Sequence, residues 1–281
     1  MIERLITLRG LPFCLCETTP PSPSKPPVLV LHGWLDQGAS WRRVAADLAA
    51  AGHPVIAPDH RGHGRSAHTP AGSYYHFPDY IADVDALLRA LDLPPVILVG
   101  HSMGGTIATT VAALRPERVS RLVLVDGLGP PATTTQQAVE QYRTHLRHLA
   151  SLRPPAVLPD VAAAAARMRR MNPLLPEEEA RVLAGRVTRS VEGGVSWTWD
   201  RLHQTRSPVA FDLARHLAML RCIEAPTTIL IGANGWYPSL PDLDDRIAAI
   251  PRVTARIDLP TGHSPHMEDP KLLVRHLLTT R

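Results

Sequence analysis

Short apolar runs alternate with longer amphipathic stretches along most of the chain. Strands buried on both faces are predicted by the apolar runs at 28–31, 54–58, 96–99, 122–125 and 227–231. Residues 41–51 and 78–92 carry helical periodicity, and the second stretch places five apolar residues on one side: Ile81, Val84, Leu87, Leu88 and Leu91. A last strand is expected near 255–259 and a last helix at 270–279. Strands that alternate with helices are typical of a mostly parallel, doubly wound α/β sheet.

Two parts of the chain depart from this alternation. Residues 2–16 predict a hairpin of edge strands, and the proline-rich residues after it must form a turn or an exposed connection. From about 128 to 222, Arg- and Ala-rich helical segments replace the strand-like runs. We therefore expect an α/β core made of residues 1–127 and 223–281, with a helical cap, 128–222, inserted between strands of the sheet.

Composition narrows the class of protein without identifying it. The chain has 281 residues, 44% of them hydrophobic and 20% charged, as in an ordinary globular protein. Its formal charge of +4 comes from scattered arginines, because lysine occurs only at Lys25 and Lys271, and we therefore expect no nucleic-acid partner. No run approaches the roughly 20 apolar residues that span a bilayer, and the N-terminus does not resemble a signal peptide. The three cysteines cannot all pair within one chain, and Cys14 and Cys16 lie two apart on a predicted strand, which is poor geometry for a disulfide. We therefore expect a reduced, cytoplasmic location.

The first candidate for chemistry is a serine at the end of a predicted strand. The apolar run 96–99 leads directly into Gly100-His101-Ser102-Met103-Gly104, a G-x-S-x-G motif that a small-residue helical pattern follows. A serine at such a strand-to-helix turn is held in a strained backbone with its hydroxyl exposed. A Cβ at either glycine would crowd the turn. The motif and its context predict that Ser102 is a nucleophile.

A serine nucleophile needs a base and donors for the developing oxyanion. His263 follows the last predicted strand, and Gly262 before it allows a tight turn, so we expect His263 to be the base. His266 is the alternative, although it could also pack beneath the site or lie on the surface. The oxyanion hole is expected from two backbone N–H groups, those of Met103 and of Trp34 in the loop after strand 28–31.

Four motifs in order resemble the α/β-hydrolase superfamily: His32-Gly33-Trp34, Asp59-His60-Arg61-Gly62-His63-Gly64-Arg65-Ser66, Gly100–Gly104 and Gly262-His263. Within it, His32-Gly33-Trp34-Leu35-Asp36 and Met171-Asn172-Pro173-Leu174-Leu175 resemble the serine hydrolase-like group, which is similar to carboxylesterases. The resemblance implies an eight-stranded, mostly parallel sheet, a Ser–acid–His triad and a helical cap. It does not fix the substrate, because one fold hosts many reactions.

The triad acid departs from the usual pattern of the superfamily. In most members it lies just after the strand that matches 227–231, but residues 232–238 contain no carboxylate and offer only Asn234. The alternative position is one strand earlier, where Asp126 follows the run 122–125. We predict that Asp126 is the acid, although it could instead hold the turn into the cap. Further alternatives are Asp242 and Asp244.

Other conspicuous residues have simpler expectations. Residues 59–66 should form a structural turn beside the site. Histidines next to glycine (His32, His63 and His101) should form hydrogen bonds, since no pair has zinc-ligand spacing, and we expect no metal and no cofactor. Four aromatic residues could line an acyl pocket or simply pack in the core: Trp197, Trp199, Trp236 and Tyr237.

The sequence therefore predicts a serine hydrolase that cleaves a small-molecule carboxylic ester through an acyl-enzyme on Ser102. The same residues could instead cleave a thioester, a lactone, an amide or a C–C bond beside a carbonyl. A third interpretation, a binding protein that has kept the fold and lost its acid, rests on the missing carboxylate after Gly232. The oligomeric state stays open.

Overall fold

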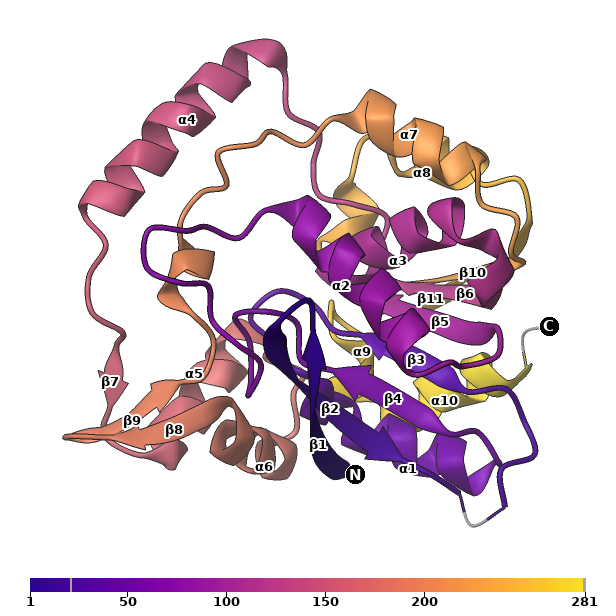
Figure 1. Cartoon of the computed structure of the whole chain (residues 1–281), viewed down its shortest axis with the longest axis horizontal. Helices are drawn as coiled ribbons and strands as arrows, with labels where there is room; N and C mark the ends of the chain where they lie inside the picture. The colour runs from indigo at the N-terminus through magenta and orange to yellow at the C-terminus, as the bar shows by residue number, and fades with distance from the viewer. Residues whose placement is uncertain (21, 280–281) are drawn as a thin grey trace.

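An eight-stranded, mostly parallel sheet forms the centre of the molecule, as the computed structural model shows for residues 1–20 and 22–279 (Figure 1). Its strands lie in the order β1 (Ile2–Leu8), β2 (Leu11–Thr18), β4 (Val55–Pro58), β3 (Val28–Leu31), β5 (Val96–His101), β6 (Val119–Val125), β10 (Thr227–Gly232) and β11 (Val253–Leu259). Strands β1 and β2 pair antiparallel, β2 pairs antiparallel with β4, and the other neighbours are parallel. The predicted fold class, including the N-terminal hairpin, is confirmed.

Alternate residues of the central strands enter two separate apolar layers. In β3, Leu29 and Leu31 belong to one layer, whereas Val28 and Val30 belong to the other. The first layer is covered by α2 (Phe77–Ala90), α3 (Met103–Leu114), α7 (Leu213–Arg221) and α8 (Leu243–Ala248). The second is covered by α1 (Arg42–Ala50) and α10 (Pro270–Thr279). Helices on both faces explain why these strands are continuous apolar runs.

The segment between β6 and β10 holds more than helices. It contains α4 (Thr135–Ala150), α5 (Val161–Met171) and α6 (Glu177–Val187), and also an antiparallel sheet of β7 (Val157–Leu158), β9 (Gly194–Trp197) and β8 (Thr188–Val191). The expectation that no strands occur here was wrong. These strands have only two to four residues, too few to show a period of two, and Gly193 and Gly194 turn the chain between β8 and β9 with positive φ.

Polar contacts tie this segment to the core, and three of them show where the two meet. The Trp34 indole donates to the carbonyl of His203 at 3.0 Å, and the Asp200 N–H donates to the carbonyl of Gly62 at 2.7 Å. Arg42 donates to Glu179 of α6. The segment therefore meets the loops that follow β3 and β4. Figure 1 shows α4, α5, α6 and the small sheet beside the main sheet, at the left of the view, whereas α7 packs against α3. In the described part of the chain, no helix is long and apolar enough to cross a membrane.

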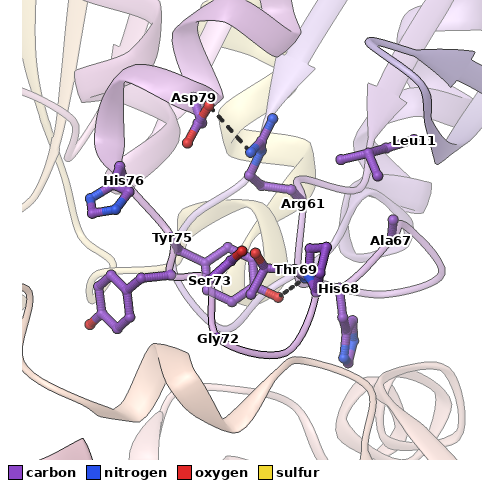
Figure 2. A pocket seen from close by; sticks show the side chains of 12 residues that line it. Leu11, Arg61, Ala67, His68, Thr69, Gly72, Ser73, Tyr75, His76 and Asp79 are labelled. Carbon is purple, nitrogen blue, oxygen red and sulfur yellow. Dashed lines mark hydrogen bonds and ion pairs between the residues drawn. The ribbon is translucent and has the colours of Figure 1, made fainter.

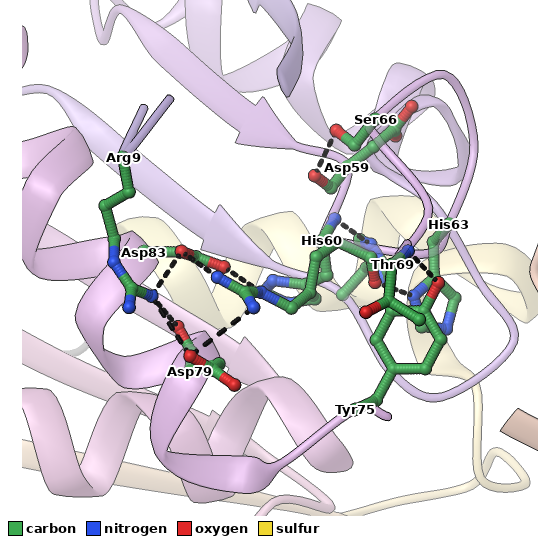
Figure 3. Close-up of polar contacts among 11 residues, drawn as sticks. Arg9, Asp59, His60, His63, Ser66, Thr69, Tyr75, Asp79 and Asp83 are labelled. Atoms are coloured by element: carbon green, nitrogen blue, oxygen red, sulfur yellow. Dashed lines mark hydrogen bonds and ion pairs between the residues drawn. The ribbon is translucent and has the colours of Figure 1, made fainter. Parts of the chain in front are cut away.

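The loop after β4 is organised around one buried carboxylate. Asp59 accepts the N–H groups of Gly38 at 2.8 Å and Arg65 at 2.9 Å, and its own carbonyl accepts the Ser66 hydroxyl (Figure 3). Burial raises the pKa of Asp59 to about 6, although the two backbone donors oppose the shift. Residues 59–66 therefore form a structural turn, as the sequence predicts.

Several histidines are buried in the folded chain. The rings of His63 and Tyr75 each stack on His203 with centroids 4.1 Å apart, and His60 lies against His32 at 4.3 Å. Burial lowers the pKa of His60 to about 3 and that of His203 to about 4. It also lowers the pKa of His216, beside α8, to about 4. Each of these groups stays neutral in the folded chain over a range where the unfolded chain protonates it.

This difference predicts unfolding in mild acid. Between about pH 6.5 and pH 4 the unfolded state binds more protons at His60, His203 and His216, so stability falls by about 1.4 kcal/mol per pH unit for each. Asp59 opposes this by a similar amount below about pH 6, because its pKa is raised on folding. For these four groups together we expect a loss of about 3 kcal/mol per pH unit near pH 5, measured by urea unfolding. The buried His32, His63 and His101, whose pKa values are also lowered, increase the loss.

A variant that keeps the ring stack isolates one contribution. His203→Phe retains an aromatic ring between its neighbours but cannot titrate, so the slope of stability against pH should decrease by about 1.4 kcal/mol per unit. The same slope in the variant and in the unsubstituted chain would contradict the assignment.

Candidate active site

Ser102 stands at the turn between β5 and α3 in a strained conformation. Its φ of 50° and ψ of −117° lie in a region that few non-glycine residues adopt. The turn is tight because α3 presses on the sheet: a Cβ at Gly104 would lie 2.1 Å from the carbonyl oxygen of Leu31. Glycine at this position therefore allows the helix to begin directly after the serine.

The serine hydroxyl begins a line of three polar groups. Ser102 Oγ lies 3.0 Å from His263 Nε2, and His263 Nδ1 lies 3.0 Å from Asp126 Oδ2. A carboxylate only accepts, so Nδ1 carries the imidazole proton and Nε2 is left to accept from the serine. Ser102 and Asp126 follow β5 and β6, and His263 follows β11, so all three side chains meet at the carboxyl edge of the sheet.

Asp126 is held on both sides. Its Oδ1 accepts the N–H of Gly232 at 2.9 Å, while Oδ2 faces the imidazole of His263. The side chain is fully buried, and burial raises its pKa, whereas the hydrogen bonds from His263 and Gly232 act in the opposite direction. Like Ser102, Asp126 has a positive φ, 44°. The strain and the two donors fix the carboxylate toward His263.

Glu268 and His101 hold the backbone on either side of His263. The Glu268 carboxylate accepts the N–H of Gly262 at 2.5 Å and that of Ser264 at 3.1 Å. The His101 ring nitrogen Nε2 donates to the carbonyl of His263 at 2.7 Å. The sequence analysis missed Glu268. Its sole signal is its place five residues after His263, and many loops have a carboxylate at such a distance.

The two expected oxyanion donors lie next to the serine in the chain and in the loop after β3. In the described part of the chain, neither the N–H of Met103 nor that of Trp34 has a hydrogen-bond acceptor. The loop passes close to the serine, since a Cβ at Gly33 would lie 3.3 Å from Ser102 Cβ. Both N–H groups are therefore available to bind an oxyanion.

The alternatives for base and acid lie elsewhere. His266 is buried, stacks on Trp41 with centroids 4.4 Å apart, and faces Asp36 instead of the serine. Asp242 pairs with Arg246, and the exposed Asp244 pairs with Arg256. Asn234 is exposed, and among the described residues its side chain has no hydrogen bond to His263. Of the candidates for the acid, Asp126 therefore contacts His263, whereas Asp242, Asp244 and Asn234 do not.

Of the aromatic residues expected at a pocket, only one is exposed beside His263. Trp236 is 42% exposed, and its ring centroid lies 5.3 Å from that of His263. Tyr237 is 1% exposed and donates its hydroxyl to the carbonyl of Gly129, so burial leaves it no surface for a substrate. Trp197 stacks on Trp199 in an apolar cluster with α5 and α6. Tyr237 and Trp197 therefore pack in the interior, the alternative that the sequence left open for each, and Trp236 is the residue kept as a proposed substrate contact.

A cavity of about 440 Å³ lies apart from these groups. It is lined by Leu11, Arg61, Asp79 and most of residues 67–76 (Figure 2). Arg61 is not free to bind a ligand there, since it forms ion pairs with Asp83 at 2.5 Å and with Asp79 at 3.4 Å, the second of which Figure 2 shows. None of its lining residues belongs to the group around Ser102, so the cavity is not part of the candidate active site.

Comparison with known proteins identifies the family. A family model described as the alpha/beta hydrolase fold matches residues 26–270. Among curated relatives, a serine hydrolase-like protein of Danio rerio is 30% identical, over 87% of this chain and 78% of its own length. The sn-1-specific diacylglycerol lipase ABHD11 of Mus musculus is 28% identical, over 88% of this chain and 78% of its own.

A solved structure extends the likeness over nearly the whole chain. The thioesterase domain from the curacin biosynthetic pathway is 37% identical, with a TM-score of 0.89 and 99% of both chains covered. The chain therefore belongs to the α/β-hydrolase fold family. Its serine hydrolase-like relatives support a general hydrolase activity.

Proposed function

We propose that this chain hydrolyses carboxylic esters through an acyl-enzyme on Ser102. The observation that carries the proposal is the continuous line from Ser102 Oγ through His263 to the buried Asp126, with both contacts at 3.0 Å. A buried carboxylate that orients the imidazole leaves Nε2 free to take the serine proton. The complete line also argues against a binding protein that has lost its acid.

The reaction proceeds in two halves. As Ser102 Oγ bonds to the ester carbonyl carbon, its proton passes to His263 Nε2, and the N–H groups of Met103 and Trp34 stabilise the oxyanion. The intermediate collapses, the C–O bond to the alcohol breaks, and His263 gives the proton to the departing oxygen. A water then adds to the acyl-enzyme, with His263 as base, and the carboxylic acid leaves as Ser102 regains its proton. Apart from the substrate and this water, the proposed reaction uses only groups of this chain.

The part of residues 128–222 outside α7, which covers the main sheet, is proposed to cap the site and select the acyl group. The hydrogen bonds from Trp34 to His203 and from Asp200 to Gly62 hold the segment against the loops that flank Ser102. Trp236 provides the exposed apolar wall beside His263. A small-molecule ester with an apolar acyl group matches this wall.

Thioesters are the second candidate, favoured by the 37% identity to a thioesterase domain across 99% of both chains. The two substrates differ in the leaving group alone, so both pass through the same acyl-enzyme on Ser102. Where deacylation limits turnover, an oxoester and a thioester with the same acyl group must share one kcat.

A paired substrate panel tests the proposal. Matched p-nitrophenyl oxoesters and aryl thioesters of two to twelve acyl carbons are assayed with the unsubstituted chain and with Ser102→Ala. We expect saturable hydrolysis in the unsubstituted chain alone, with equal kcat for the two members of at least one pair. Hydrolysis of thioesters without oxoesters would replace the first candidate by the second. Turnover of neither class, in a folded chain, would overturn the proposal.

A further inference from the structure

Three potential metal ligands from separate segments lie close together, and one of them, His101, lies next to His263. Asp36 lies in the loop after β3, His101 ends β5, and His266 lies in α9 (Pro265–Glu268). One ligand atom of each lies within 4.8 Å of the other two, and the three residues are at most 9% exposed. The ring centroids of His101 and His266 are 4.6 Å apart, and those of His101 and His263 are 4.9 Å apart.

The proton positions of the two histidines leave lone pairs without partners. Since His101 Nε2 donates to the carbonyl of His263, its Nδ1 presents a lone pair, and this buried atom has no hydrogen-bond partner in the described part of the chain. His266 Nδ1 is also buried and without a partner there, while its Nε2 faces Asp36 at 3.2 Å. Buried polar atoms in native proteins nearly always have partners, and a bound ion would supply one for His101 Nδ1.

The geometry at His101 is the one that metal-bound histidines show. Such a histidine ligates through one nitrogen and donates its other N–H to a backbone carbonyl, as His101 does to His263. Because the Asp36 carboxylate only accepts, His266 Nε2 carries a proton here, and a bound ion would replace that proton. The distance of 3.2 Å between His266 Nε2 and Asp36 Oδ2 is close to the edge of a tetrahedron with bonds of about 2.0–2.1 Å. Two imidazoles and one carboxylate suit Zn²⁺ or Co²⁺, whereas Mg²⁺ and Ca²⁺ prefer oxygen ligands.

We infer that Asp36, His101 and His266 form a binding site for one divalent transition-metal ion of the zinc type, and that binding of this ion lowers the turnover of the hydrolase. Binding draws the three side chains inward, because ligand atoms up to 4.8 Å apart must approach to fit one ion. Movement of His101 then displaces the carbonyl of His263, to which it is hydrogen-bonded. Movement of His266 displaces α9, which begins two residues after His263. The imidazole loses its alignment with Ser102, and turnover falls. This effect on turnover rests on the proposed function, whereas binding of the ion does not.

Binding and inhibition are tested separately on the full chain. Co²⁺ is titrated and followed by the visible absorption of the tetrahedral ion, with stoichiometry from elemental analysis after desalting. We expect one ion per chain. Asp36→Asn and His266→Gln should each weaken binding at least tenfold, while the exposed-histidine control His76→Gln should leave it unchanged. Circular dichroism establishes folding, and Asp36→Asn, which keeps the shape of the side chain, decides the matter if His266→Gln does not fold.

His263→Asn separates this site from the candidate active site. It should still bind one Co²⁺, because His263 is not one of the three ligands. Loss of binding in His263→Asn, unchanged binding in Asp36→Asn, or no bound ion at all would overturn the inference. In the activity arm, Zn²⁺ should inhibit ester hydrolysis of the unsubstituted chain, and Asp36→Asn, compared with its own metal-free rate, should need at least tenfold more Zn²⁺. Equal sensitivity of the two chains would also overturn it.

Discussion

Ser102→Ala is expected to lower kcat for ester hydrolysis by at least about 10⁴-fold, the largest effect of any single substitution in this chain. Alanine retains the backbone and removes the one atom, Oγ, that faces His263 Nε2 at 3.0 Å. Without it no acyl-enzyme forms, and the remaining rate comes from binding and oxyanion stabilisation of direct attack by water. Steady-state assays on the same ester preparation measure the ratio.

The variant is expected to fold as the unsubstituted chain does. The backbone strain at position 102 is the same for alanine, and the hydroxyl contributes no contact in the described chain except that with His263. A Tm within a few degrees of the unsubstituted value supports this, and loss of activity can then be assigned to chemistry. A folded Ser102→Ala that retained full activity would exclude the mechanism.

Asp126→Asn is expected to lower kcat by about 10³- to 10⁴-fold. An asparagine amide that donates toward His263 Nδ1 favours the imidazole with its proton on Nε2, which can no longer accept from Ser102. It also removes the negative charge that stabilises the imidazolium formed in each half-reaction. The Gly232 N–H can still be accepted by the amide oxygen, so the fold should be retained.

Asp244→Asn is the matched control for this prediction. Asp244 was an alternative acid, but its side chain is 87% exposed and pairs with Arg256 instead of His263. Its substitution should change kcat less than twofold. Unchanged kcat in Asp126→Asn would give Asp126 a purely structural role, and a large loss in Asp244→Asn would return it to the list of candidates for the acid.

The sheet and its order were predictable because buried parallel strands leave a strong pattern. Runs such as 28–31 and 122–125 are apolar at every position, and helices on both faces account for this. The three strands near Trp197 were not predictable, since each has at most four residues and pairs only inside the small sheet. Short strands with glycines between them resemble loops in any pattern based on periodicity.

The polar groups of the site were predictable to the extent that each follows a strand. Ser102, Asp126 and His263 lie at carboxyl ends that a parallel sheet brings to one edge, so their meeting follows from topology. Topology could not predict whether Tyr237 and Trp197 lie in the core or line a pocket. Aromatic residues serve cores and pockets alike, and burial distinguishes the two.

The grouping of Asp36, His101 and His266 could not be predicted from their spacing in the sequence. Zinc motifs are recognised when ligands lie a few positions apart, whereas here the three come from a loop, a strand end and a helix. Glu268 was missed for a related reason, since its contacts are to backbone N–H groups.

The most direct measurement is the intact mass of the chain after incubation with a fluorophosphonate, which reacts only with an activated serine. We expect one phosphonyl adduct per chain, located on Ser102 by peptide mapping and absent from Ser102→Ala. Labelling should be at least 100-fold slower in His263→Asn, because the hydroxyl then lacks its base. No adduct on the folded chain, or an adduct that persists in Ser102→Ala, would contradict the claim that Ser102 is an activated nucleophile.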